Sequence, residues 1–359
     1  MKIKVGNITK IKTGKLDANA SSPDGKYPFF TCSKEPLKIN SYSYDCECVL
    51  VAGNGDLNVK YFNGKFDAYQ RTYIIEDNSN GLLHIPYLYY FLENYIKELR
   101  KQSIGGVIKY IKLENLTEVS LELPTIAEQK RIVSIMETCS KLLISKNNVI
   151  EKMDLLTKAR FVEMFGDPII NPYGFPVKKI DEVAALNKGI TYSPDDISKE
   201  GIIVLRSGNI KGDAFDLEDI VRISKKISND KLVNENDILM CNRNGSVKLV
   251  GKVAKIPKLE EKMTFGTFMT IVRSDIFEYL FVFFQTSAFR EQIKFQTAVA
   301  INQISLPLLA SVKVPIPTNE LIKEFADFVH QVDKSKLAVQ QSLEKTQQLF
   351  DSLMQEYFG

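Results

Sequence analysis

The stretch from Leu123 to Phe165 decides the fold: LPTIAEQKRIVSIMETCSKLLISKNNVIEKMDLLTKARFVEMF. After Pro124, apolar side chains recur in alternating steps of four and three residues over about five heptads, the pattern of a coiled-coil seam. The helix should end at Phe165, because Gly166 suits a left-handed cap and Pro168 prevents continuation. At ~1.5 Å per residue, such a helix is roughly 55–60 Å long.

The chain contains this pattern twice. Leu123-Pro124-Thr125 matches Ile316-Pro317-Thr318, and Phe165-Gly166 matches Phe358-Gly359, both at an offset of 193 residues. Two long stripes in the same phase favour pairing of the helices with each other or with a sister chain. The first predicted seam comprises Ile132, Met136, Cys139, Leu143, Lys146, Ile150, Met153 and Thr157. The second comprises Phe325, Val329, Val332, Lys336, Val339, Leu343, Thr346, Phe350, Leu353 and Tyr357. A lysine inside each seam costs stability and can set the register.

The regions outside the two helices predict mixed α/β modules. Each module should end in an apolar-aromatic helix, near 85–99 and 276–293, and then a short strand that leads into the Pro-Thr junction. Fainter repeats pair Asn54-Gly55 with Asn244-Gly245, and Tyr87-Leu88 with Tyr279-Leu280. The expected strands are 48–51, 60–62 and 71–75 in the first module, and 202–205, 237–240, 251–256 and 269–272 in the second.

Composition limits the function without deciding it. The net charge of the 359 residues is +3, and the two modules are only slightly basic: residues 1–123 carry 16 Lys and Arg against 14 Asp and Glu, and residues 169–317 carry 20 against 17. This balance permits nucleic-acid binding but does not demand it. The two histidines, His84 and His330, make histidine-rich metal catalysis and a Ser-His-Asp triad improbable.

Five cysteines without a zinc-type spacing indicate free thiols in a reducing cytoplasm. The sequence has no run of ~18 apolar residues that could span a membrane, and residues 1–6 lack the apolar core of a secretion signal. We therefore expect a cytoplasmic protein with no membrane contact, no metal and no cofactor.

DNA readout needs loop-borne Arg, Lys, Asn and Gln side chains. In the first module the candidates are Lys10, Lys12, Lys15, Lys26, Tyr27, Asn54, Asn58, Lys60, Arg71 and Lys109. In the second they are Arg206, Asn209, Lys211, Asn242, Arg243, Asn244, Lys248, Arg273, Asn302 and Gln303. The strongest single cluster is the loop 241–245, whose side chains suit adenine and guanine edges and whose glycine permits a tight turn.

Catalytic alternatives are poorly supported. Asn171-Pro172-Tyr173 resembles the Asn-Pro-Pro-Tyr motif of amino-methyltransferases only in part, and a turn after the helix cap explains it better. A nuclease site built from Asp195 and Glu260-Glu261-Lys262 has loose spacing, and no Walker A loop is present. Two classes remain: a DNA-sequence reader, and a non-catalytic protein-interaction scaffold with two β-rich modules on a coiled coil.

The whole chain resembles the specificity subunit of Type I restriction-modification enzymes. Leu123-Pro124-Thr125-Ile126-Ala127-Glu128-Gln129-Lys130-Arg131-Ile132 is similar to the entry of the family's central conserved helix, whereas the second copy, 316–325, lacks the Glu-Gln pair. The stretches 8–14 and 183–189 resemble the openings of the family's recognition domains, and 302–305 resembles the step before the last strand.

The resemblance implies an α+β fold with two target-recognition domains, 1–123 and 169–316, and two helical regions, 124–168 and 317–359. The helices would form an antiparallel coiled coil that sets the distance between two DNA half-sites. The implied partners are double-stranded DNA, two adenine-methylating M subunits and, in the full enzyme, two ATP-driven R subunits. A specificity subunit catalyses no reaction itself.

Overall fold

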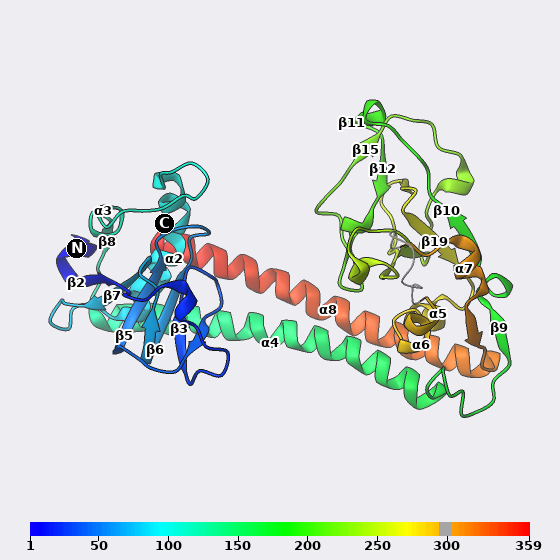
Figure 1. Cartoon of the computed structure of the whole chain (residues 1–359), viewed down its shortest axis with the longest axis horizontal. Coiled ribbons are helices and arrows are strands. Elements are labelled where there is room, and N and C mark those ends of the chain that lie inside the picture. The colour runs from blue at the N-terminus through cyan, green and yellow to red at the C-terminus, as the bar shows by residue number, and fades with distance from the viewer. Residues whose placement is uncertain (294–302) are drawn as a thin grey trace. The chain divides into compact units, whose positions relative to one another are not determined.

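The computed structural model describes residues 1–293 and 303–359 (Figure 1). These residues form two compact units, one of Met1–Asn148 with Val339–Gly359 and one of Val149–Ala338. Each unit contains one β-rich module and part of both long helices, α4 (Ile126–Phe165) and α8 (Asn319–Phe358). The chain is therefore a mixed α and β protein in both units.

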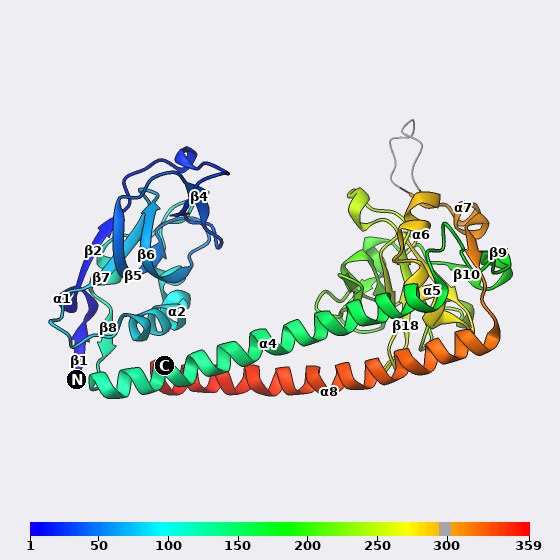
Figure 2. The same cartoon turned by 90° about the horizontal axis from the view of Figure 1, so that it is seen from below.

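A six-stranded sheet forms the module of the first unit, with the strand order β2-β7-β5-β6-β3-β4. Helix α2 (Ile85–Gln102) packs against β5 and β6 (Figure 2). The six strands are β2 (Thr9–Thr13), β3 (Tyr27–Phe30), β4 (Leu37–Ile39), β5 (Tyr44–Ala52), β6 (Val59–Ala68) and β7 (Thr72–Asp77). The smaller elements are β1 (Lys2–Lys4), α1 (Val5–Ile8), η1 (Ala18–Ala20), α3 (Glu114–Thr117) and β8 (Ser120–Glu122), and β1 pairs with β8.

Two four-stranded sheets form the module of the second unit, with the orders β10-β19-β16-β17 and β11-β15-β12-β18, and two further pairs join β13 to β14 and β20 to β9. The strands are β9 (Val177–Lys179), β10 (Ala185–Lys188), β11 (Ile197–Ser198), β12 (Ile202–Leu205), β13 (Ile210–Lys211), β14 (Ala214–Phe215), β15 (Arg222–Ile223), β16 (Ile238–Cys241), β17 (Val253–Lys255), β18 (Met263–Phe265), β19 (Met269–Arg273) and β20 (Lys313–Pro315). The helices are η2 (Ile180–Glu182), η3 (Pro194–Asp196), η4 (Ser207–Asn209), η5 (Asn229–Lys231), η6 (Val247–Leu249), α5 (Phe277–Phe283), α6 (Ser287–Gln292) and α7 (Leu306–Ser311).

Both units repeat one strand topology. Strand β5 lies between antiparallel neighbours β6 and β7, as β16 lies between β17 and β19. Strand β3 runs parallel to the end of β6, as β12 runs parallel to β18. A buried tyrosine then ties the following helix to the last strand: the Tyr87 hydroxyl donates to the Glu122 carbonyl at 3.0 Å, and the Tyr279 hydroxyl donates to the Pro315 carbonyl at 2.6 Å. The sequence repeat is thus a structural repeat.

A glycine closes the curl of the sheet in each unit. A Cβ on Gly14 would lie 2.1 Å from the Ala68 carbonyl oxygen, and one on Gly189 would lie 2.0 Å from the Gly266 carbonyl oxygen. Both distances are far below van der Waals contact, so only glycine allows the backbones to approach this closely. These glycines end the two stretches that resemble the openings of recognition domains.

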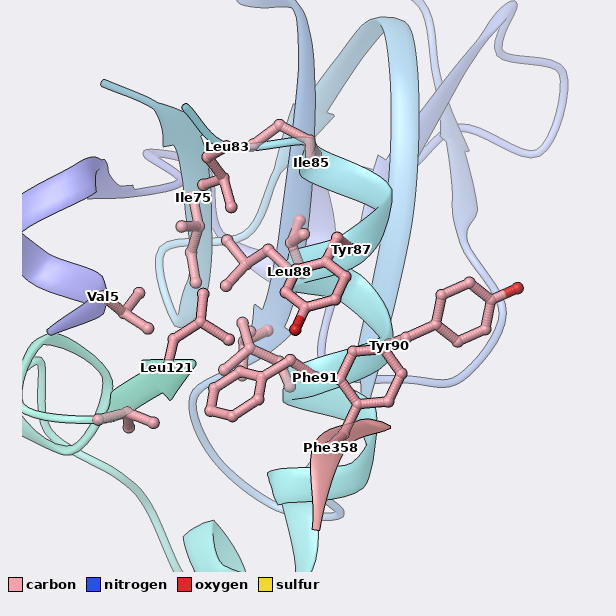
Figure 3. Packing of buried hydrophobic residues seen from close by; sticks show 14 of the residues in the cluster. Val5, Ile75, Leu83, Ile85, Tyr87, Leu88, Tyr90, Phe91, Leu121 and Phe358 are labelled. Atoms are coloured by element: carbon pink, nitrogen blue, oxygen red, sulfur yellow. The ribbon is translucent and has the colours of Figure 1, made fainter. Parts of the chain in front are cut away.

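The last turn of a long helix completes the core of each module. In the first unit the ring of Phe358, on α8, lies 5.1 Å from that of Tyr87, with Tyr90 and Phe91 beside them (Figure 3). In the second unit Phe165, on α4, lies 5.0 Å from Tyr279. Aromatic pairs at this separation stabilise the core beyond the burial of apolar area. A phenylalanine-tyrosine pair thus anchors one helix end to the module in each unit.

The helices α4 and α8 run antiparallel within each unit. In the first unit the Lys146 ammonium donates to the Ser342 carbonyl at 2.9 Å and to the Thr346 hydroxyl at 2.5 Å. In the second unit Lys336 pairs with Asp154 at 2.5 Å and Arg160 with Glu324 at 2.8 Å. Every residue of the two predicted seams is buried or half-buried. The two seam lysines therefore reach polar groups of the facing helix instead of remaining unpaired.

Two expectations about the helices and strands need correction. Residues 276–293 do not form one continuous helix, because α5 ends at Phe283 and α6 begins at Ser287. The Thr286 hydroxyl caps α6 by accepting from the Phe289 amide at 3.3 Å. Strands β5 and β6 extend well beyond the expected 48–51 and 60–62. They pair with each other over eight residues, from Tyr44 opposite Phe66 to Val51 opposite Val59.

Candidate nucleic-acid interface

Three backbone segments meet beside one another at the end of β5 in the first unit. The Gly53 amide donates to the Arg71 carbonyl at 2.8 Å, and the Ile111 amide donates to the Gly53 carbonyl at 2.9 Å. One residue further along, Asn54 and Tyr110 face each other as an antiparallel bridge. The loops that start at Asn54, precede β7 and follow α2 are therefore held together at one end of the sheet.

The second unit builds the same arrangement from different side chains. The Asn242 amide donates to the Phe268 carbonyl at 2.9 Å, and the Ile304 amide donates to the Asn242 carbonyl at 2.8 Å. Arg243 and Gln303 form the antiparallel bridge. Arg243, and not Asn244, is thus the structural counterpart of Asn54, which shifts the expected loop alignment by one residue.

A compensating pair of residues keeps the two backbones alike. In the first unit a Cβ at Gly53 would lie 2.4 Å from the Arg71 carbonyl oxygen and 3.0 Å from the Tyr73 ring, whose hydroxyl donates to the Ile111 carbonyl at 3.1 Å. In the second unit Thr270 takes the place of that tyrosine, and the Asn242 side chain fills the space and donates to the Thr270 hydroxyl at 3.1 Å. Both units therefore keep the same two backbone hydrogen bonds, although both side chains differ.

Arg243 is presented by an aromatic support. Its guanidinium carbon lies 4.9 Å from the ring centre of Phe268, whose side chain is 50% exposed. The neighbouring Asn244 is held by its amide, which donates to the Ser207 hydroxyl at 3.1 Å, while its oxygen accepts from the Ser246 amide at 3.0 Å. A half-exposed guanidinium that lies over an aromatic ring keeps its N–H donors free to reach an acceptor at the edge of the guanidinium group.

Exposed basic residues account for six of the predicted DNA contacts. These side chains are exposed and have no ion pair among the residues that the structure describes. They are Lys10, Lys15, Lys26, Arg71, Lys109 and Lys248. Such flexible cations suit contacts to phosphate groups, which need charge more than fixed geometry.

Four other predicted cations already hold an acidic partner. Arg273 binds both carboxylate oxygens of the buried Asp237 at 2.7 Å. This bidentate pair ties β19 to the turn before β16, so Arg273 is a structural residue, and its prediction as a DNA contact is not supported. The other three pairs are Lys12 with Glu76, Arg206 with Asp219 and Lys211 with Glu218. Their charge is partly neutralised before any phosphate arrives.

Burial removes two asparagines from the predicted contacts. Asn209 is 1% exposed, and its amide donates to the carbonyls of Asp216 at 2.9 Å and Asp219 at 3.0 Å. Asn242 is 6% exposed and holds Thr270. Neither side chain can reach a base edge from these positions, so both predictions are corrected to structural roles.

The remaining predicted DNA contacts differ in how exposed their side chains are. The Asn58 amide donates to the Cys32 carbonyl at 2.8 Å and accepts from Lys60, and burial lowers the pKa of Lys60. Tyr27 is half-buried with its ring 4.9 Å from Tyr42. Gln303 is exposed, and Asn302 lies outside the described residues.

Sequence reasoning missed two residues at this interface, Tyr110 and Phe268. Tyr110 lies 193 positions before Gln303, so the offset of the repeat could have indicated it. Phe268 carries no such signal, because an exposed aromatic residue after Gly266-Thr267 is indistinguishable in sequence from a core residue.

The possible catalytic motifs have structural explanations. The Asn171 side chain closes a turn, since its amide donates to the Phe175 carbonyl at 2.8 Å and its oxygen accepts from the Phe175 amide at 3.0 Å. Glu261 binds the Arg222 guanidinium at 2.6 and 2.8 Å. Across residues 1–293 and 303–359, no three His, Cys, Asp or Glu side chains gather closely enough to hold a metal ion. In the part of the chain that the structure describes, no helix combines the length and apolar character needed to cross a membrane.

Known proteins share both the sequence pattern and the fold. The Type I restriction enzyme EcoDI specificity subunit of Escherichia coli is 39% identical over 156 residues, which cover 44% of this chain and 34% of that protein. The EcoKI specificity subunit of E. coli K12 is 27% identical over 183 residues, 47% of this chain and 39% of that protein. The chain thus spans 34% and 39% of the lengths of these two curated relatives.

The fold resembles that of a solved specificity subunit. The crystal structure of the Type I restriction-modification S subunit from M. genitalium matches with a TM-score of 0.62 at 16% identity, over 100% of this chain and 96% of that one. The family model described as the Type I restriction modification DNA specificity domain matches residues 1–152 and 172–348. Since this match covers both copies of the repeat, the chain belongs to the Type I restriction-modification DNA specificity family.

Proposed function

We propose that this chain is the DNA-reading specificity subunit of a Type I restriction-modification complex, with one module for each half of a split target. The observation that carries the proposal is the repeated arrangement of three backbone segments at Gly53 and Asn242, which presents different side chains from one backbone design. Two similar readers with different side chains are what a two-part, asymmetric sequence requires. The proposed recognition domains are residues 1–123 and 169–316.

The chemistry of the exposed side chains suits double-stranded DNA. Arg243 can bind guanine through two hydrogen bonds, and Asn54 and Gln303 can do the same with adenine. The exposed Lys15, Lys109 and Lys248 would hold phosphate groups and fix the register without reading sequence. The proposal therefore divides the surface into readers on the bridges and phosphate contacts around them.

The helical regions 124–168 and 317–359 are proposed to act as a spacer between the two half-sites. The support is the antiparallel contact of α4 with α8 inside each unit, through Lys146 in the first and Lys336 in the second. A paired helix resists bending more than a single one, so an antiparallel coiled coil can hold a fixed distance.

The partners are proposed to dock on the outer faces of these helices. In the second unit Leu155 is 64% exposed, and Leu156, Val162 and Leu337 are also exposed. Large apolar side chains that are exposed on helices are often found at protein-protein contacts. We assign this surface to two methyltransferase subunits, with restriction subunits joining the full complex. Methyl transfer and cleavage would then occur in the partner chains, within the cytoplasm.

A gel-shift assay with the methyltransferase complex tests DNA reading. We expect binding to random duplexes at low salt that weakens at moderate salt, because released counterions drive this component. A protein-interaction scaffold without DNA affinity would give no shift at either salt concentration. Methylome sequencing of a host that expresses both subunits should then show one two-part methylated site, and methylation without any sequence preference would contradict the proposal.

A further inference from the structure

We propose that Asn54, Arg71 and Tyr110 in the first unit, and Arg243, Phe268 and Gln303 in the second, are matched reading triads that determine specificity at one corresponding position of each half-site. This inference rests on the proposed function and deepens it, since it names which side chains choose the base.

The equivalence of the triads comes from hydrogen bonds, not from sequence similarity. Each central segment donates to the residue before a strand, Arg71 or Phe268, at 2.8 and 2.9 Å. Each also accepts from a crossing segment, at 2.9 Å from Ile111 and 2.8 Å from Ile304. The three members of each triad lie on or next to these bonded residues, so they occupy the same places on the same backbone.

The side chains differ at all three places although the backbone does not. Asn54 corresponds to Arg243, Arg71 to Phe268 and Tyr110 to Gln303. The paired bridge residues lie directly opposite each other, so their side chains project from one face at a spacing of about 5 Å. Adjacent bridge side chains can thus engage a single base pair together with its neighbour.

The internal contacts explain why the triad acts as a unit. The Arg243 guanidinium carbon lies 4.9 Å from the centre of the Phe268 ring, so the two side chains form one contact pair. In the first unit the corresponding residues are Asn54 and Arg71, and the Gly53 amide next to Asn54 donates to the Arg71 carbonyl at 2.8 Å. Moving Arg243 alone into the first unit would place it against Arg71, and the two cations would repel each other.

Exchanging a whole triad avoids that repulsion and keeps the net charge unchanged. The variant Asn54→Arg with Arg71→Phe and Tyr110→Gln gains one cation and loses one. Non-specific affinity, which follows charge, should therefore stay the same. The buried Gly53 and the half-buried Tyr73 remain unchanged, so the local backbone contacts are preserved.

The test uses the full chain with its methyltransferase subunits and a library of duplexes with randomised half-sites. First, Arg243→Ala should lower the preference at one base pair of a single half-site by about five- to hundredfold, the range for a bidentate contact. The triad variant should then create a preference for that same base in the other half-site. As a control, Asn78→Arg adds an arginine beyond the opposite end of β7 and should change no position of the profile.

The outcomes separate the two levels of the proposal. If the parent complex binds all library members alike, the proposed function fails. If the parent is selective but the triad variant and Arg243→Ala leave the profile unchanged, the triads are not the readers. Should the triad variant unfold by circular dichroism, the single changes Asn54→Ala and Arg243→Ala carry the test, and two unchanged profiles would overturn the inference.

Discussion

A single buried glutamine explains why the most specific sequence motif occurs in only one copy. Gln129 is fully buried at the start of α4, where its amide donates to the carbonyls of Leu82 at 2.8 Å and Pro124 at 2.9 Å. Its oxygen accepts from the His84 amide at 2.8 Å. The Gln129 side chain thus joins the first turn of α4 to residues 82–84, which precede α2. The second copy has Ile322 at this place, which packs into the apolar core.

We expect Gln129→Leu to destabilise the first unit. The leucine fills a similar volume but leaves two carbonyls and one amide without partners, at about 1–3 kcal/mol for each buried group. The combined cost should be roughly 2–5 kcal/mol, since such effects do not add fully. Thermal unfolding followed by circular dichroism should show a Tm lower by about 5–15 °C.

The neighbouring change Lys130→Leu serves as its control, because the Lys130 side chain is exposed and lies outside the apolar core of the first unit. Its Tm should stay within a degree or two of the parent, as for most surface substitutions. Equal melting of Gln129→Leu and Lys130→Leu would show that the three hydrogen bonds do not stabilise the unit.

Among the elements, the long helices were the most predictable from sequence and the curled sheets the least. The helix phase depends on spacing within one segment, so the positions of the seam and the stop at Gly166, with its φ of +72°, could be read directly. The closure at Gly14 depends on a carbonyl far along the chain, at Ala68. The burial of Asn242 likewise depends on Thr270, a pairing that no local pattern reveals.

An unpaired charge in the seam should destabilise the pairing of α4 with α8. Met136 is completely buried against the first module, so Met136→Asp places a carboxylate in an apolar environment without a partner. We expect a loss of several kcal/mol and loss of association with the methyltransferase subunits, measured by size-exclusion chromatography. The change Thr138→Asp, two residues away on the exposed side of the same helix, should leave both properties intact.

The half-buried lysine of the first seam, Lys146, has a different expected effect. Lys146 binds Thr346 and the Ser342 carbonyl, and the Thr346 hydroxyl keeps a second bond to Ser342 at 2.8 Å. Replacing Lys146 with Met removes the cation and leaves these groups paired, so stability should stay within about 1 kcal/mol or rise. Chemical denaturation would check this, and a loss as large as that of Met136→Asp would contradict the weak energetic role we assign to the lysine.

At the scale of the whole molecule, the proposed spacer predicts that helix length sets the gap between the half-sites. Deleting 144–150 and 340–346 removes one heptad from each helix and keeps the phase of both seams. It also removes Lys146 together with its partner Thr346, so no unpaired cation remains. A heptad is ~10 Å of helix, or about three base pairs at ~3.4 Å each.

Methylome sequencing of the double-deletion variant should therefore show both half-sites unchanged and the spacer shortened by about three base pairs. Deleting 144–150 alone serves as the control, because it leaves one helix longer than the other and should abolish methylation. Methylation at the original site with its original spacer would refute the spacer proposal. That result would not bear on the proposed reading triads, since they depend on contacts inside each module and not on α4 and α8.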